Sequence, residues 1–281
     1  MKRFHFILLV WLALATTALA DGDKRLVILH TNDTHSTILP VSPLIEDTMK
    51  ADRGGFLRRI ALIEEQRKSD PELLLFDSGD FSQGSSFFTL FKGEVEVSLM
   101  NRMHYDAGTL GNHEFDFGVE NLATQLRHAN FPIVCANYDF GTTPLAELVR
   151  PYVVLKRKGL RIGVFGLSPQ PEGLIATEND AGITFRDPIE ATRETVSTLR
   201  TKEKCDLVIC LSHLGWPAKD PLSDSNVFIQ TEGVDLVLGG HSHTFMKELE
   251  WLTDAQGNRV PVDQNGKHAI YVGRIVMNLS R

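Results

Sequence analysis

The feature that most constrains this chain is a repeated order of a short apolar stretch, a polar loop and a segment with helical periodicity. The stretch RLVILHTNDTHS is followed by GGFLRRIALIEEQRKS, in which Phe56, Ile60 and Ile63 have helical spacing. The same order returns from ELLLFDSGD to GEVEVSLMNRM and from DAGTLGNHEFD to VENLATQLRHA. Strands that alternate with helices favour an α/β fold in which helices cover the sheets.

Further elements continue this order to the end of the chain. We expect strands in FPIVCANYD, RIGVFGLSP, CDLVICLSH and VDLVLGGHSH, and a helix from Asp187 to about Lys202. One or two closing strands are expected in HAIYVGRIVMNLS, after a turn at Asn265 and Gly266. Because no Pro/Gly/Ser-rich linker, repeat or low-complexity tract interrupts the pattern, we predict a single domain over residues 21–281.

Residues 1–20 are typical of a secretory signal peptide. Lys2 and Arg3 precede an apolar run, and the segment ends in the small-residue pattern ALA. The run is too short to cross a membrane, which takes about 20 residues. No cysteine follows at the cleavage position, so a lipid anchor is not expected there. We therefore expect an exported protein, periplasmic or secreted, without stable membrane insertion.

Charge and cysteine content narrow the function further. The formal net charge is −7, which disfavours binding to a polynucleotide through a broad basic face. Small anionic substrates remain compatible with an acidic chain if bound metal ions outweigh the local negative charge. Cys135, Cys205 and Cys210 lie in apolar runs and are predicted to be buried free thiols without a structural disulfide.

Five apolar stretches end in loops that carry Asp, Asn or His with Gly or Ser beside them. These loops are TNDTHS (31–36), DSGDFSQGS (77–85), LGNHEFD (110–116), LSHLG (211–215) and GGHSHT (239–244). In open α/β sheets, ligand sites form at the carboxyl ends of strands, so these loops predict one shared site. The loops hold five of the ten histidines. The others are interpreted as structural, exposed or part of the signal peptide: His5, His30, His104, His128 and His268.

Seven side chains in these loops are candidate metal ligands. They are Asp33, His35, Asp80, Asn112, His213, His241 and His243. The i, i+2 spacing of D-x-H and H-x-H directs both side chains of a pair to the same side if the backbone is extended. A tetrahedral zinc site takes four ligands at most, so seven donors predict two metal ions that share one carboxylate. Glycines beside the ligands allow sharp turns and close approach of a substrate.

The ordered motifs D-x-H, G-D-x-x-x-G, G-N-H-E, a solitary His after a strand, and G-H-x-H resemble the calcineurin-like metallophosphoesterase superfamily. The segments HTNDTHS, GDFSQGS, LGNHEFDFG and GGHSHT are similar to the motifs of its 5′-nucleotidase branch. The resemblance runs from Leu26 to about Ile275. It implies an α/β metallophosphoesterase fold, a four-layer α/β–β/α sandwich of two mixed sheets flanked by helices.

The resemblance also implies a role for each candidate residue. One divalent metal ion would be held by Asp33, His35, Asp80 and His243. The second would be held by Asp80, Asn112, His213 and His241, with Asp80 bridging. A hydroxide between the two ions would attack phosphorus in line, without a covalent phospho-enzyme. The mixed ligands are compatible with Zn, Mn, Co or Fe.

Beside the metals, the resemblance makes His113 the catalytic side chain. It would stabilise charge on the phosphoryl oxygens or protonate the leaving group. Asp116 would accept a hydrogen bond from the other ring nitrogen of His113, fix its tautomer and raise its pKa. Glu114 is interpreted as a structural residue of the same turn.

Full 5′-nucleotidases continue into a C-terminal domain that binds the nucleoside, and the resemblance does not extend to that domain. The expected function is an exported phosphomonoesterase for a small phosphate ester, most simply a nucleotide. A phosphodiesterase, a UDP-sugar pyrophosphatase or a thiosulfate-type hydrolase with the same metal-binding residues is one alternative. The other is a metal-binding subunit that a separate chain with the specificity domain completes.

Overall fold

The structure is a computed structural model that describes residues 24–216 and 218–279. The predicted signal peptide therefore lies outside the described residues. Within the described ranges, no helix is both long enough and apolar enough to cross a membrane.

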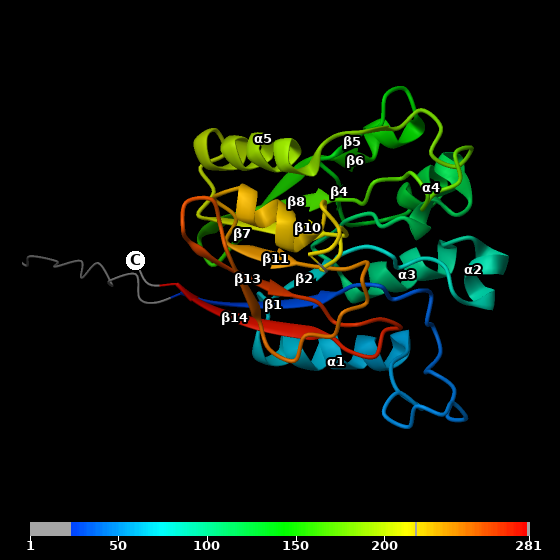
Figure 1. Ribbon diagram of the computed structural model, residues 1–281. Helices are drawn as coiled ribbons and strands as arrows, with labels where there is room; N and C mark the ends of the chain where they lie inside the picture. Colours follow the sequence, from blue (N-terminus) through cyan, green and yellow to red (C-terminus); the bar gives the residue numbers. More distant parts are fainter. Residues whose placement is uncertain (1–23, 217, 280–281) are drawn as a thin grey trace, which may run out of the picture.

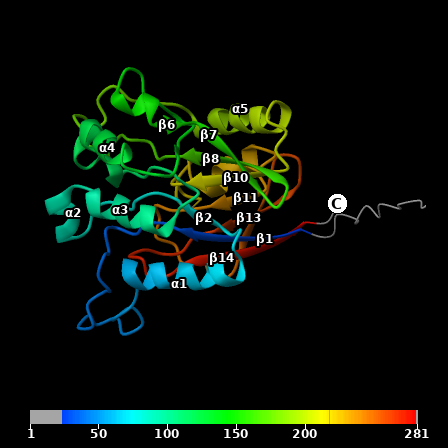
Figure 2. The same cartoon turned by 180° about the vertical axis from the view of Figure 1, so that it is seen from behind.

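Two six-stranded sheets form the centre of the molecule (Figures 1 and 2). The first sheet has the order β14-β1-β2-β3-β4-β6, and only β14 is antiparallel to its neighbour. Its strands are β1 (Lys24–Thr31), β2 (Leu74–Asp77), β3 (Ala107–Gly108), β4 (Ile133–Val134), β6 (Val149–Arg150) and β14 (Gly273–Leu279).

The second sheet has the order β12-β13-β11-β10-β8-β7, with parallel central strands and antiparallel pairs at both edges. Its strands are β7 (Tyr152–Arg157), β8 (Leu160–Leu167), β10 (Leu207–Ser212), β11 (Leu236–Leu238), β12 (Glu250–Thr253) and β13 (Arg259–Asp263). A separate antiparallel pair joins β5 (Tyr138–Asp139) to β9 (Thr184–Phe185).

Helices lie on the outer faces of the two stacked sheets, α1 on one side and α5 on the other (Figure 1). The α-helices are α1 (Phe56–Ser69), α2 (Ser86–Phe91), α3 (Glu94–Met103), α4 (Gly118–Leu126), α5 (Pro188–Thr201) and α6 (Asp224–Val227). In the described part of the chain, three short 3₁₀ helices are η1 (His113–Phe115), η2 (Pro144–Glu147) and η3 (Phe228–Gln230). The predicted four-layer sandwich of two mixed sheets is confirmed.

Alternation along the strands explains these layers. In β1, Leu26 and Ile28 belong to the apolar core between the two sheets, together with Ile209 of β10. The intervening Val27 and Leu29 belong to the core beneath α1, α3 and α4. Because both faces of β1 are buried, its sequence is a continuous apolar run rather than an alternating one.

The two long helices begin where the sequence predicts. In α1, Phe56 and Ile63 are buried and Ile60 is half-buried, so the predicted face does pack on the sheet. The side chain of Asp187 accepts hydrogen bonds from the backbone N–H groups of Ile189 and Glu190 and so caps α5.

Several elements were not expected from the sequence. These are the hairpin of β12 and β13, the edge strand β7 and the short helix α2. FPIVCANYD forms two separate two-residue strands, β4 and β5, and the tail forms the single strand β14. All three cysteines are buried and free, as predicted.

The two sheets lie in close contact at Gly166, near the end of β8. A Cβ atom at this position would lie 2.0 Å from the carbonyl oxygen of Val134 and 2.3 Å from Oγ1 of Thr109. The backbone N–H of Ala136 also donates a hydrogen bond to the carbonyl oxygen of Gly166, at 2.8 Å. Gly166 therefore allows backbone from the two sheets to meet directly, one residue before β8 ends.

We predict that Gly166→Ala lowers the free energy of unfolding by about 1–3 kcal/mol, the usual effect of overpacking a core. Urea unfolding measures the change in midpoint. Gly108→Ala is the matched control, since neither glycine has a left-handed φ and a Cβ at Gly108 would lie no closer than 3.3 Å to a neighbouring atom. If the two variants were equally destabilised, the overlap at Gly166 would not be the cause and the prediction would be wrong.

Candidate metal centre

The five polar loops begin at strand ends that the two sheets bring together. β1, β2 and β3 are parallel neighbours in the first sheet, and β10 and β11 are parallel neighbours in the second. Hydrogen bonds tie the loops to one another. The backbone N–H of Asp33 donates to the carbonyl oxygen of Gly79, at 2.9 Å, and the N–H of His241 donates to the Asp33 carboxylate, at 3.0 Å.

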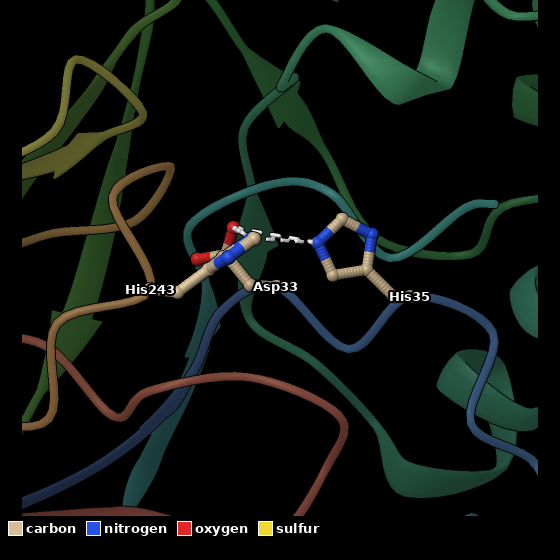
Figure 3. A group of neighbouring side chains, drawn as sticks. All are labelled: Asp33, His35 and His243. Carbon is tan, nitrogen blue, oxygen red and sulfur yellow. Dashed lines mark hydrogen bonds and ion pairs between the residues drawn. The ribbon is translucent and has the colours of Figure 1, made fainter. Parts of the chain in front are cut away.

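One donor group consists of Asp33, His35 and His243, which point toward a common centre (Figure 3). Nε2 of His35 lies 3.0 Å from Nε2 of His243, and Nε2 of His243 lies 3.3 Å from Oδ1 of Asp33. Donors about 2.1 Å from a tetrahedral metal ion are about 3.4 Å apart. The spacing of this first donor group therefore suits ligands of one cation.

A second donor group consists of Asp80, His213 and His241. Nε2 of His213 lies 3.0 Å from Oδ2 of Asp80. Its Nδ1 lies 2.6 Å from the carbonyl oxygen of Ser78, so Nδ1 carries a proton and donates that bond, and Nε2 is the nitrogen that faces Asp80. The buried carboxylates Asp80 and Asp33 raise the pKa of His213 to about 10, so a metal ion bound at Nε2 would take the place of a proton there.

Asn112 completes the set of predicted donors. Its buried Oδ1 has no hydrogen-bond partner among the described residues, although buried carbonyl oxygens nearly always have one. Asp80 lies between the two donor groups, since its Oδ2 is 4.0 Å from Nε2 of His35 and 3.0 Å from Nε2 of His213. Asn112 immediately precedes His113, whose backbone N–H binds the Asp80 carboxylate, so its unpartnered oxygen fits a ligand of a cation there.

Electrostatics favour the same interpretation. Asp33 and Asp80 are almost completely buried, and a buried carboxylate is costly unless a cation or several hydrogen bonds compensate it. Burial lowers the pKa of both His35 and His241 to about 4. These imidazoles are therefore neutral at pH 7, which is the form that binds metal ions.

The backbone at the donors corrects one expectation. The D-x-H and H-x-H pairs are not extended, because φ is +46° at Asp33 and His35, +70° at His241 and +55° at His243. Asp80, with φ +54°, is also left-handed. Side chains converge through these left-handed turns rather than through strand alternation. Such conformations are unfavourable for residues other than glycine, and they concentrate at functional sites.

Gly111 is required by the packing beside Asp80. A Cβ atom at Gly111 would lie 2.2 Å from Oδ1 of Asp80 and 2.7 Å from Nε2 of His213. Any larger residue at this position would therefore displace Asp80, which the two donor groups share, or His213.

His113 and Asp116 lie beside the donor groups as a hydrogen-bonded pair. Nδ1 of His113 lies 3.1 Å from both carboxylate oxygens of Asp116, and this hydrogen bond raises the pKa of His113. Because Asp116 engages Nδ1, Nε2 is the free ring nitrogen. The backbone N–H of His113 donates to Oδ1 of Asp80, at 2.9 Å, so the same residue also orients the shared carboxylate.

Glu114 occupies a structural position, in agreement with its interpretation from the sequence. Its buried carboxylate accepts hydrogen bonds from the backbone N–H groups of Asp80, Ser82 and Gly111, at 2.7–3.0 Å. Glu114 therefore joins the loop after β2 to the loop after β3 and fixes the position of Asp80.

Two histidines outside the five loops differ in their surroundings. His30 is buried and its Nε2 lies 2.9 Å from Oδ2 of Asp263, which agrees with a structural role. His268, which the sequence set apart from the site, lies with its ring centre 6.0 Å from that of His35. Its backbone N–H donates to the carbonyl oxygen of Asp33, at 2.8 Å. The distance of 235 residues between His268 and Asp33 concealed this contact in the sequence.

The sandwich and its Asp, His and Asn donors at the carboxyl ends of the strands define a protein of the metal-dependent phosphoester hydrolase class. The sequence model of the calcineurin-like phosphoesterases matches residues 26–245. The chain belongs to the calcineurin-like phosphoesterase family.

Individual relatives agree with this assignment. The chain is 35% identical to a human (Homo sapiens) 5′-nucleotidase over 274 residues, which cover 90% of this chain and 46% of the relative. The structure of a 5′-nucleotidase precursor from Thermus thermophilus matches with a TM-score of 0.81 and 30% identity, over 90% of this chain and 51% of that one. The calcineurin-like phosphoesterase YfkN from Bacillus subtilis matches with a TM-score of 0.76 and 26% identity, over 92% of this chain and 86% of that one. The chain thus spans about half the length of the curated relatives it matches.

We predict that the metal-free protein gains thermal stability when Mn²⁺ or Zn²⁺ is added, because cations offset the charge of the buried carboxylates. A metal-ion concentration of about 100 times the dissociation constant stabilises the folded protein by about 2.7 kcal/mol, which raises Tm by about 5–10 °C. Differential scanning fluorimetry after dialysis against a chelator measures this shift.

The ligand set is tested by metal content. His243→Ala is expected to lower bound metal by about one ion per chain, measured by mass spectrometry of the intact holoprotein. His268→Ala, which changes a neighbouring histidine without a predicted ligand role, should bind as much metal as the wild type. Equal loss in both variants would contradict the assignment.

Proposed function

We propose that this protein is an exported, dinuclear metal-dependent phosphomonoesterase of the 5′-nucleotidase type. The observation that carries the proposal is the convergence of two donor groups on a shared Asp80, with the His113–Asp116 pair beside them. The named 5′-nucleotidases among its relatives support the same substrate class. The proposal that the protein is exported is based on the sequence of residues 1–20. We also propose that residues 21–281 form one catalytic domain.

The two donor groups fit two divalent cations, Zn, Mn, Co or Fe. One cation would be held by Asp33, His35 and His243, and the other by Asn112, His213 and His241. Asp80 would bind both cations. When bound, such ions activate water as the nucleophile for in-line attack on phosphorus and offset the charge of the phosphate. The neutral amide of Asn112 keeps the centre from carrying excess negative charge.

The residues of the chain then act on the substrate and on each other. His113 presents Nε2 toward the reaction while Asp116 holds Nδ1. A raised pKa keeps the ring protonated over a wider pH range, so Nε2–H can donate to a phosphoryl oxygen or to the departing oxygen. Glu114 and the backbone N–H of His113 hold Asp80 in place during this step.

The proposal is tested by phosphate release from a panel of esters with added Mn²⁺, Zn²⁺ or Co²⁺. The panel holds 5′-AMP, a 2′,3′-cyclic nucleotide, a UDP-sugar and p-nitrophenyl phosphate. Selective release from 5′-AMP is expected. If the protein preferred the cyclic nucleotide, the proposed activity would be a phosphodiesterase instead. If it preferred the UDP-sugar, the proposed activity would be a pyrophosphatase.

Two further outcomes of the panel concern a partner chain. Activity confined to p-nitrophenyl phosphate would support a separate C-terminal specificity domain, which co-purification from native extract then identifies. Absence of activity with every metal ion would favour the metal-binding subunit and overturn the proposal.

We predict that His113→Asn reduces kcat by about 10²–10⁴, the usual contribution of a general acid or a positioned proton donor. Both metal ions should remain bound, because His113 is not among the proposed ligands. The test is sharp because a ring nitrogen of His113 lies within 4.8 Å of ligand atoms of His35 and Asp80, where it could itself bind a metal ion. If metal content fell together with turnover, His113 would be a ligand instead.

A further inference from the structure

A sixth strand-end loop, residues 264–270 after β13, lies against the candidate metal centre without supplying a predicted ligand. β13 is parallel to β11, so its carboxyl end lies at the same edge of the second sheet as the loop GGHSHT. The sequence indicated only a turn in this sixth loop, at Asn265 and Gly266. In the structure, the sixth loop is bonded to the segments that carry the first donor group.

One set of hydrogen bonds joins the sixth loop to the segment that carries His241 and His243. The side chain of Gln264 is fully buried. Its Nε2 donates to the carbonyl oxygen of Gly240, at 2.6 Å, and its Oε1 accepts from Oγ of Ser242, at 3.0 Å. The start of the sixth loop is therefore fixed relative to both histidines.

A second set of hydrogen bonds joins the sixth loop to Asp33. Nδ2 of Asn32 donates to Oδ2 of Asp33, at 2.6 Å, and to the carbonyl oxygen of Gly266, at 2.9 Å. The backbone N–H of His268 donates to the carbonyl oxygen of Asp33. The backbone is left-handed at His268, with φ +62°, and at Ala269, with φ +57°. Such strain persists only where the surrounding contacts impose it, so the backbone that carries the His268 ring is held in place.

The ring of His268 is available to a ligand. It is half-buried, and neither ring nitrogen forms a hydrogen bond with the residues that the structure describes. Its centre lies 6.0 Å from that of His35, with 72° between the rings, and the His113 ring lies 5.4 Å from His35 at the same angle. His268 belongs to none of the described groups of converging metal-ligand atoms. Two imidazoles that are not predicted ligands therefore lie beside the same metal ligand.

We propose that His268 donates a hydrogen bond from its ring to an oxygen of the phosphoryl group bound at the metal centre. This inference rests on the proposed phosphomonoesterase function and adds a second substrate-contacting imidazole to His113. An imidazole carries at least one N–H in each tautomer and in the protonated form, so a donor is always present. Phosphoryl oxygens are anionic acceptors, and hydrogen bonds to charged groups are stronger than those between neutral groups. Because the sixth loop is already fixed, binding does not have to order it.

The test measures binding of inorganic phosphate to the Mn²⁺-loaded protein by isothermal titration calorimetry. Inorganic phosphate has the phosphoryl oxygens but no leaving group, so it isolates the proposed contact. In His268→Ala, the dissociation constant for phosphate should rise by about 10- to 100-fold, the scale of one hydrogen bond to a charged group. The value of kcat/KM for p-nitrophenyl phosphate should also fall, while the bound metal stays the same.

Three further variants separate this contact from a packing role. His268→Gln keeps a side-chain N–H donor and should recover part of the phosphate affinity. His268→Leu has a similar size but no donor, so it should bind phosphate as weakly as His268→Ala and replaces that variant if it fails to fold. His128→Ala removes an exposed imidazole after α4 and should bind phosphate like the wild type. The urea midpoint of each variant reports whether the fold is retained.

Each outcome bears on a separate claim. Weaker phosphate binding in the variants without a donor, with partial recovery in His268→Gln, supports the inference. Equal phosphate affinity in the wild type and in these variants overturns it, and the proposed function stands if the wild type still hydrolyses a phosphomonoester. Loss of bound metal in His268→Ala would make His268 a ligand and would also overturn it. If the wild type hydrolysed no phosphomonoester, the proposed function would fail, and the inference with it.

Discussion

The structure depends on the burial of two carboxylates, Asp33 and Asp80, where the two sheets meet. Their negative charge has to be compensated, and among the described residues the groups that contact them are histidines, backbone N–H groups and the Asn32 amide rather than lysine or arginine. Burial keeps two of these histidines, His35 and His241, neutral at pH 7. Metal cations are the compensation that this combination of ligands favours.

The surrounding fold serves to hold these groups in position. Parallel strands bring five loops to one end, and left-handed backbone at five donors aims their side chains inward at a conformational cost. Glu114 and Gly111, both in the loop after β3, offset part of that cost by fixing Asp80 in the loop after β2, one through three amide hydrogen bonds and one by having no side chain. The two sheets supply this rigidity because their cores are closely packed on both faces.

Strongly periodic parts of the fold were predictable from the sequence, and irregular parts were not. Helix α1 and strands β1, β10 and β11 follow directly from apolar spacing, and the order of the polar motifs indicated the family. The left-handed turns at Asp33 and His241 could not be inferred, since glycine rather than aspartate or histidine normally signals such turns. The place of His268 beside His35 depends on a contact across most of the chain, and no local pattern encodes it.

The most direct test of this account is anomalous X-ray diffraction from crystals grown with Mn²⁺, measured at the manganese absorption edge. We predict two peaks per chain, about 3.5–4 Å apart, with the Asp80 carboxylate between them. The first should contact Asp33, His35 and His243, and the second should contact Asn112, His213 and His241. A single peak, or two peaks that do not share Asp80, would contradict the account.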